Sequence, residues 1–138
     1  MGKTIVKFAG GMQFIGQGES GHAVLMDSDP RVGGEDTALR PVETMLCALG
    51  GCTGMDVISI LRKMRTVPTE FRIEIEDARA TEHPKVLTKV HLIYRFKGNV
   101  PKENADKAIR LSMERYCPIT NIINKVAEVT WESVVEPD

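Results

Sequence analysis

The segment from Pro41 to about Met64 constrains the fold of this chain more than any other. Its apolar residues recur at helical spacing, which predicts one helix of about 25 residues. Pro41 suits the first turn of a helix, Arg62 and Lys63 suit the last turn, and Pro68 ends the pattern. The apolar positions lie on more than one side of this helix: Val42, Met45, Leu46, Leu49, Val57, Ile60, Leu61 and Met64. A helix with this pattern is predicted to be central and buried.

Strand patterns precede and follow this helix. Residues 4–27 alternate between apolar and polar positions and contain two glycine-rich turns, which predicts a three-stranded meander. A long loop spans residues 27–40. After the helix, strands are expected at 71–76 and 86–96, helices at 101–116 and 118–125, and a last strand at 126–135. The order β-β-β-α-β-β-α-α-β predicts a single α+β domain over residues 1–138, with antiparallel or mixed sheets packed on helices.

Composition argues against several classes of partner. A formal net charge of −1 argues against a nucleic-acid partner or an anionic membrane surface. No apolar run approaches the roughly 20 residues of a membrane span, so no membrane partner is expected. The N-terminus lacks the apolar core of a signal peptide, and an odd count of 3 cysteines indicates reduced thiols. The expected location is the cytoplasm.

Two cysteines lie in unusual settings. Cys52 lies within Gly50-Gly51-Cys52-Thr53-Gly54, where glycines give up helix stability for backbone room and access. Cys117 lies in Tyr116-Cys117-Pro118 at a predicted helix start, where unpaired N–H groups favour a thiolate. The two are 117 − 52 = 65 residues apart, so neither a CxxC motif nor a zinc knuckle describes them. Two such thiols from distant segments predict a peroxide-reducing pair.

Each cysteine also has a purely structural interpretation. Cys52 could be a small buried core residue, and Cys117 could be a helix cap. Cys47 falls off the helical face of Cys52 and is expected to be structural. A zinc site built from all three cysteines stays open, although no usual ligand spacing supports it.

Two charged residues precede Cys52 and are candidate site residues. Glu43 at the helix start can satisfy the helix dipole or belong to a hydrogen-bonded network at the thiol. Arg40 is the nearest fixed cation in sequence, and its guanidinium can hold a thiolate or a peroxide oxygen. A surface position is the alternative for Arg40.

Two segments carry a resemblance to a known family. Arg40-Pro41-Val42-Glu43-Thr44-Met45-Leu46, followed by Leu49-Gly50-Gly51-Cys52-Thr53-Gly54-Met55-Asp56-Val57, resembles the signature helix of the OsmC/Ohr family. That family contains osmotically inducible protein C and the organic hydroperoxide resistance proteins. Arg115-Tyr116-Cys117-Pro118-Ile119 is similar to the second cysteine segment of the family. The resemblance covers essentially the whole chain and is strongest to the smaller branch with Pro-x-Glu before the cysteine helix.

The chain departs from the better-characterised branch at two places. There the acidic residue directly follows the proline, where this chain has Val42 and places Glu43 one position later. That branch also has an arginine in an N-terminal turn, and the corresponding Glu19-Ser20-Gly21-His22 has none. Arg40 is the candidate substitute.

The resemblance implies an intertwined homodimer with active sites at the subunit interface. It implies thiol-dependent reduction of organic hydroperoxides without haem, flavin or metal, with Cys52 as the peroxidatic cysteine and Cys117 as the resolving one. A dithiol donor, such as a lipoyl protein, thioredoxin or a small thiol, would restore the thiols. The apolar pocket is expected to include Met45, Leu49, Met55 and Ile119. The alternative is a noncatalytic dimeric protein that binds an apolar small molecule at the same interface, which the missing N-terminal arginine supports.

Overall fold

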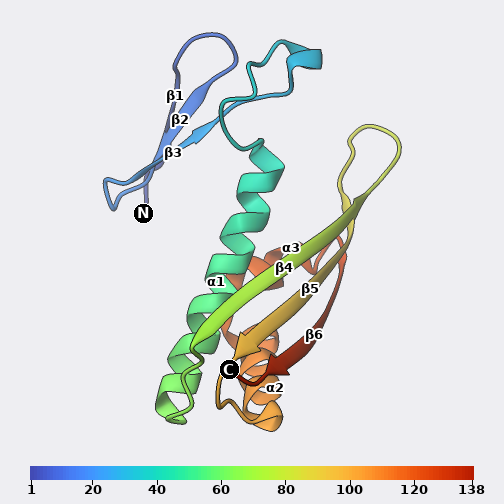
Figure 1. Ribbon diagram of the computed structural model, residues 1–138. Helices are drawn as coiled ribbons and strands as arrows, with labels where there is room; N and C mark the ends of the chain where they lie inside the picture. Colours follow the sequence, from blue (N-terminus) through green and yellow to red (C-terminus); the bar gives the residue numbers. More distant parts are fainter. The chain divides into compact units, whose positions relative to one another are not determined.

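A computed structural model describes residues 1–138 as an α+β protein, which confirms the predicted fold class. Three strands precede a long helix, and two strands, three helical segments and a last strand follow it (Figure 1). The chain divides into two compact units, residues 1–47 and 48–138, which are described separately below. The prediction of one domain stays a prediction.

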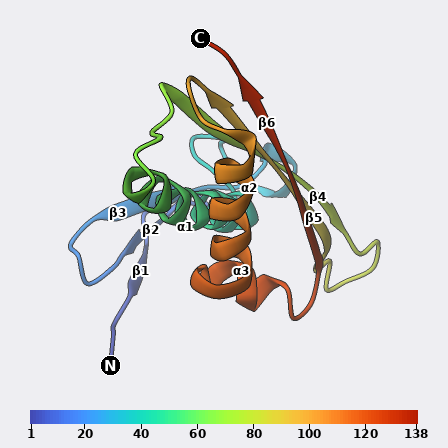
Figure 2. The same cartoon turned by 90° about the horizontal axis from the view of Figure 1, so that it is seen from below.

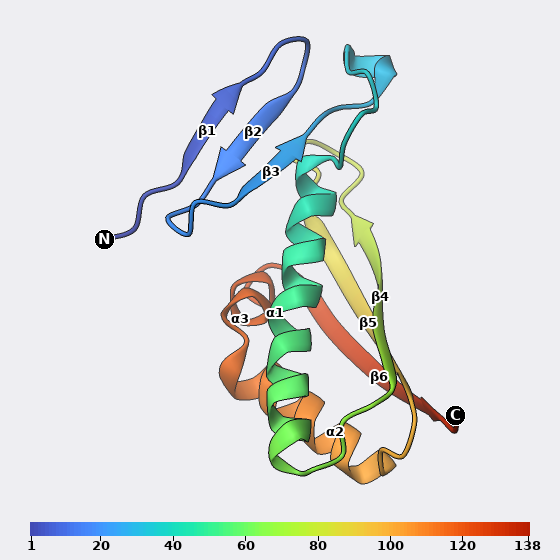
Figure 3. The same ribbon diagram turned by 60° about the vertical axis from the view of Figure 1, so that its left-hand side comes forward.

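The first unit holds an antiparallel sheet of order β1-β2-β3 (Figure 3). Its strands are β1 (Ile5–Phe8), β2 (Phe14–Gln17) and β3 (Ala23–Met26). β2 begins at Phe14, because residues 10–13 form the turn: the Gln13 N–H donates to the Gly10 carbonyl at 2.9 Å, and the Ala9 N–H donates to the Gln13 carbonyl at 2.9 Å. The predicted three-stranded meander is therefore confirmed.

Both faces of this sheet carry exposed apolar side chains in the single chain. The strand register places Val6, Phe8, Phe14 and Val24 on one face and Ile5, Ile15 and Leu25 on the other. All seven are exposed, and Phe8 is 65% exposed although its ring lies 5.6 Å from that of Phe14. A soluble antiparallel sheet normally has one polar face, so this sheet lacks the cover that its composition requires.

A buried carboxylate organises the loop after β3. Asp27 is 2% exposed and accepts hydrogen bonds from the Thr37 hydroxyl at 2.5 Å and from the N–H groups of Ser28, Glu35 and Thr37 at 2.7, 3.3 and 3.1 Å. These bonds, chiefly the one from the Thr37 hydroxyl, lower the pKa of Asp27 to about 2. Within the loop, Asp29 caps the short 3-10 helix η1 (Pro30–Val32).

The helix α1 (Pro41–Lys63) is continuous, so its glycines do not interrupt it. Its buried side chains form one stripe spaced four residues apart: Leu49, Thr53, Val57 and Leu61. The expectation of a helix buried on several sides is therefore wrong for the single chain, in which Met55 is 76% exposed. By length and composition alone α1 is also long and apolar enough to cross a membrane. One such helix is weak evidence, because the central helix of a soluble protein passes the same test.

The second unit holds a mixed sheet of order β4-β5-β6. β4 (Glu70–Arg79) is antiparallel to β5 (Leu87–Lys97), and β6 (Glu128–Glu136) is parallel to β5. The parallel pair requires a crossover, which α2 (Lys102–Leu111), the π-helical turn η2 (Ser112–Tyr116) and α3 (Pro118–Ile123) provide (Figure 2). On the helix-covered face of the sheet, the β5 side chains Val90, Leu92, Tyr94 and Phe96 are buried and form the core.

Acid should destabilise the loop that Asp27 holds. Because the folded pKa of Asp27 lies below its unfolded value of about 3.9, its contribution to stability is complete above that value and is lost as pH falls toward about 2. We expect Asp27→Asn to unfold at lower denaturant than the wild type at pH 7. The difference should shrink below pH 4. Denaturant unfolding of both proteins from pH 7 to pH 2 measures it.

Asp77→Asn is the matched control, because Asp77 is exposed and its only ion pair, with Arg79, is 3.8 Å long. A pH-independent difference between Asp27→Asn and the wild type would contradict the role given to Asp27.

Candidate thiol site

Every polar atom of Cys117 makes a hydrogen bond. It is the N-cap of α3, and its Sγ accepts the Thr120 N–H at 3.4 Å, which confirms its predicted place at a helix start. Its own N–H donates to the Ser112 carbonyl at 2.8 Å, five residues back, which closes the π-helical turn. Its carbonyl accepts from the Asn121 side chain at 2.8 Å. The residue is fully buried. Its Sγ caps α3, as the structural interpretation of Cys117 predicts.

Cys52 lies beside Cys117. It occupies the middle of α1, is partly exposed, and its thiol lies close enough to the Cys117 thiol for the two to affect each other's ionisation. Burial raises the pKa of Cys52, the Cys117 thiol raises it further, and the Ile119 N–H lowers it. The structure thus brings together two thiols 65 residues apart in sequence. In the single chain their surroundings favour protonated Cys52 over the thiolate that a peroxidatic cysteine needs.

Two of the glycines around Cys52, Gly50 and Gly54, pack against β4. A Cβ on Gly50 would lie 3.2 Å from Cδ1 of Ile75, and a Cβ on Gly54 would lie 3.4 Å from Cδ1 of Ile73. Both glycines therefore let α1 approach β4. A Cβ on Gly51 would meet no atom of another segment within 4 Å. Neither a Cβ on Gly50 nor one on Gly54 would meet an atom of the Cys117 segment within 4 Å, so these two glycines serve the contact with β4.

A buried chain of hydroxyl groups lies next to the thiols. Thr53 Oγ1 is 2.8 Å from the Tyr94 hydroxyl and 2.8 Å from Ser112 Oγ, and Ser112 Oγ donates to Asp56 Oδ2 at 2.8 Å. Thr53, Tyr94 and Ser112 are fully buried. Sequence reasoning missed this chain. The only available signal was that Thr53 and Asp56 follow Cys52 by one and four residues, on the same helix.

Arg40 and Glu43 lie in the first unit and have partners of their own. Glu43 Oε1 accepts the backbone N–H of Arg40 at 2.8 Å, which is the dipole-satisfying role expected at a helix start. The Arg40 guanidinium pairs with Asp36 and, at 3.6 Å, with Asp29. The Asp36 carboxylate raises the pKa of Arg40. A role for either residue at the thiols stays a prediction.

The other expected site residues differ in exposure. Of the four expected pocket residues, Leu49 is buried, Ile119 is partly buried, and Met45 and Met55 are exposed. Cys47 is exposed as well. No group of three or more His, Cys, Asp or Glu side chains is placed to hold a metal ion.

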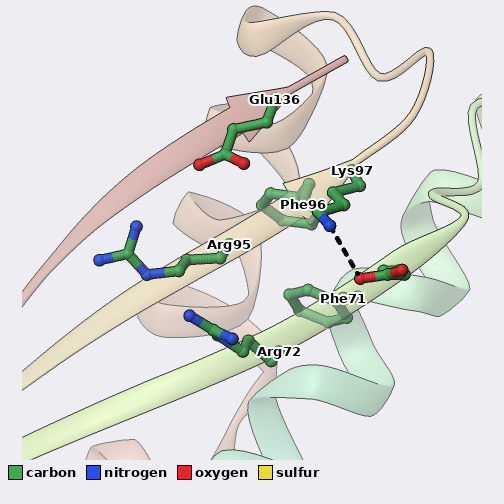
Figure 4. A pocket seen from close by; sticks show the side chains of 7 residues that line it. Phe71, Arg72, Arg95, Phe96, Lys97 and Glu136 are labelled. Atoms are coloured by element: carbon green, nitrogen blue, oxygen red, sulfur yellow. Dashed lines mark ion pairs between the residues drawn. The ribbon is translucent and has the colours of Figure 1, made fainter. Parts of the chain in front are cut away.

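A cavity lies at the second sheet, among charged residues of its three strands. The cavity of about 300 Å³ is lined by residues of all three strands: Glu70, Phe71, Arg72, Arg95, Phe96, Lys97 and Glu136 (Figure 4). Its cations are paired, since Arg72 and Arg95 contact Glu74 at 2.8 and 2.9 Å and Lys97 contacts Glu70 at 3.5 Å. Neither cysteine lines this cavity, so it is separate from the thiol pair.

The fold and the adjacent thiols define an α+β protein with a paired-cysteine site. Residues 34–132 match the family described as OsmC-like protein, and the chain belongs to that family. It is 34% identical over 126 residues to Protein YhfA of Escherichia coli (strain K12), covering 91% of each chain.

Solved structures share the fold. A hypothetical protein from Aquifex aeolicus VF5 is similar with a TM-score of 0.81, at 24% identity and with 98% of this chain and 97% of that chain covered. The organic hydroperoxide resistance protein OsmC from Legionella pneumophila is similar with a TM-score of 0.70, at 17% identity and with 95% and 96% covered.

Alkylation should report the environment of each thiol. At pH 7.5 we expect iodoacetamide to label exposed Cys47 first, partly exposed Cys52 more slowly and buried Cys117 last. Because its pKa is raised, Cys52 labelling should accelerate only at a pH above that at which a free cysteine side chain ionises. In Cys117→Ala, loss of the neighbouring thiol should lower the pKa of Cys52 and speed its labelling. Peptide mass spectrometry over time measures the rates, and faster labelling of Cys52 than of Cys47 at pH 7.5 would contradict the raised pKa.

Proposed function

We propose that this protein is a thiol-dependent peroxidase that reduces organic hydroperoxides to alcohols in oxidative-stress defence. The observation that carries the proposal is that the Cys52 and Cys117 thiols, 65 residues apart in sequence, lie next to each other in the folded chain. Disulfide formation requires two cysteines at close range, and these two are already neighbours in the folded chain. Membership of the OsmC-like family supports the same activity, since a protein of this fold from Legionella pneumophila is named for organic hydroperoxide resistance.

The proposed reaction uses only the two thiols and an external dithiol. The Cys52 thiolate attacks the distal peroxide oxygen, the O–O bond breaks, and the alkoxide takes a proton and leaves as an alcohol. Cys52 becomes a sulfenic acid. The Cys117 thiol then attacks that sulfur, and water leaves as the disulfide forms. A dithiol donor reduces the disulfide by exchange and is itself oxidised. Neither a cofactor nor a metal takes part.

We infer that the working form is a homodimer. Seven exposed apolar side chains on both faces of the β1-β2-β3 sheet, and an apolar α1 with one buried stripe, leave more apolar surface than a stable monomer exposes. We infer that a second copy of the chain covers these apolar side chains. Under this proposal the interface also encloses the thiol pair, and the protein works in the cytoplasm.

Burial disfavours the thiolate form of Cys52, so a neighbouring group must stabilise it. We propose that Arg40 and Glu43 belong to the assembled site, with the guanidinium favouring the thiolate and the carboxylate orienting it. Arg40 is suited to this because it is permanently charged and only partly exposed.

A second candidate function is a noncatalytic protein that binds an apolar small molecule at the dimer interface. The raised pKa of Cys52 favours it, because a protonated thiol is a poor nucleophile. Peroxide consumption in the presence of a dithiol separates the two candidates.

Cysteine variants test the peroxidase directly. With a tertiary alkyl hydroperoxide and excess dithiol, we expect Cys52→Ser to lose turnover to the uncatalysed level, because serine forms no sulfenic acid. In Cys117→Ser, one equivalent of peroxide should oxidise Cys52 only to sulfenic acid. Excess peroxide should oxidise it further to sulfinic acid. Arg40→Gln should slow the first step. Cys47→Ser is the matched control and should keep wild-type turnover, whereas normal turnover by Cys52→Ser would end the proposal.

Association should depend on the exposed sheet. We expect the wild type to elute as a dimer at micromolar concentration, and Phe8→Asp to shift toward monomer because it places a charge in the covered face. Val126→Asp replaces another exposed apolar residue, outside that sheet, and should stay dimeric. Light scattering during gel filtration measures the mass. A wild type that is monomeric at all concentrations would refute the dimer.

A further inference from the structure

The hydroxyl chain beside the thiols has a fixed direction. The carboxylate of Asp56 only accepts hydrogen bonds, so Ser112 must donate to it. A hydroxyl has one proton, so Ser112 accepts from Thr53, and Thr53 accepts from Tyr94. The protons therefore all point along the series Tyr94, Thr53, Ser112, Asp56. Reversing any member would leave a buried oxygen facing another without a proton between them, which is costly in a dry core.

Ser112 joins the two cysteine-bearing segments through this chain. Its hydroxyl is bound on both sides to α1, by Thr53 next to Cys52 and by Asp56 one turn later. Its carbonyl accepts the N–H of Cys117 at 2.8 Å. One residue thus ties the backbone of Cys117 to the helix that carries Cys52. The π-helical turn makes this possible, because it brings the carbonyl of residue 112 to the N–H of residue 117.

Apart from the contacts of the Cys52 thiol itself, the polar partners of Cys117 do not reach α1. The Cys117 carbonyl and Sγ are bound by Asn121 and Thr120, which belong to α3. These bonds fix Cys117 within its own segment and leave its distance from Cys52 unspecified. Apolar packing holds the segments together but has no preferred direction. Besides the contacts of the Cys52 thiol itself, which include the Ile119 N–H, Ser112 therefore supplies the directional control of the thiol–thiol geometry.

We propose that Ser112, held by Asp56 and Thr53, is a positioning residue that keeps Cys117 in bonding range of Cys52 and so favours their disulfide. The inference deepens the proposed function, on which its place in a peroxidase cycle rests. Pairing of the thiols itself needs no peroxide: the two thiols and one oxidised glutathione give the disulfide and two reduced glutathiones. The step that Ser112 serves is the second one, in which Cys117 attacks, and the first oxidation of Cys52 does not depend on it.

The test is the thiol–disulfide equilibrium in glutathione buffers of varied ratio. It uses the full chain carrying Cys47→Ser, so that only one pair is read, with peptide mapping of the Cys52–Cys117 cross-link. Losing a buried hydrogen bond to a charged group is expected to lower the equilibrium constant for the disulfide about tenfold in Ser112→Ala. Asp56→Ala should lower it as well, and Asp56→Asn should lower it less because an acceptor oxygen remains.

Two controls separate positioning from general damage to the core. Ser59→Ala makes the same substitution at an exposed serine of α1 and should leave the equilibrium unchanged. Tyr94→Phe removes a hydroxyl from the same chain but keeps both Ser112 bonds, so it should lower thermal stability with a smaller effect on the equilibrium. If Ser112→Ala does not fold, Asp56→Asn gives the test alone. A wild-type equilibrium in Ser112→Ala and Asp56→Ala, or a change in Tyr94→Phe equal to that in Ser112→Ala, would overturn the proposal.

A single-turnover experiment separates this inference from the proposed function. With an alkyl hydroperoxide, Ser112→Ala should form sulfenic acid on Cys52 at the wild-type rate and convert it to the disulfide more slowly. If the wild type consumes no peroxide while the glutathione equilibrium still falls in Ser112→Ala, the peroxidase proposal fails and the positioning role stands. Absence of any Cys52–Cys117 disulfide in oxidised glutathione would overturn the positioning role.

Discussion

The contact between the middle of α1 and the sheet of the second unit sets the position of everything around the thiols. Four side chains of α1 are buried there, and one of them, Thr53, is polar. A buried hydroxyl needs partners, and Thr53 finds them in Tyr94 of β5 and Ser112 of η2. Burial alone would let α1 rotate or slide against the sheet. The two hydrogen bonds of Thr53 remove that freedom, and the position of Cys52, the preceding residue, follows from them.

Most of the fold could be predicted from the sequence, because periodicity records which side of an element is apolar. The strand patterns after Pro68 and the helix from Pro41 are examples, and their bounds differ from the observed ones by only a few residues. The exposure of α1 could not be predicted. An apolar pattern shows that a surface is to be covered but not by which chain, and in the single chain only the stripe through Leu49 and Leu61 is covered. The parallel pairing of β5 and β6 was likewise hidden, because local sequence does not encode strand partners.

The thiol pair was predictable from unusual local settings, whereas its supporting residues were not. Cys52 among glycines and Cys117 before a proline stand out in the sequence, yet Gly50 and Gly54 face Ile75 and Ile73 of β4. In the sequence, Ser112 is one residue within the predicted helix at 101–116. Ser112 matters because of its tertiary hydrogen bonds, two to α1 and one to Cys117. No spacing in the sequence reveals these contacts.

The π-helical turn also makes the length of this segment critical. A π turn contains one residue more than an α turn would, and each residue of a helix advances the side-chain direction by roughly 100°. A chain one residue shorter between Ser112 and Cys117 would continue α2 as an ordinary helix and carry the cysteine about a quarter of a turn away from α1. α2 is fixed by its packing on β6. The extra residue therefore rotates the following side chains relative to α2, so that the thiol of Cys117 faces Cys52. Insertions and deletions in residues 112–117 should consequently be far less tolerated than substitutions at the exposed positions Glu114 and Arg115.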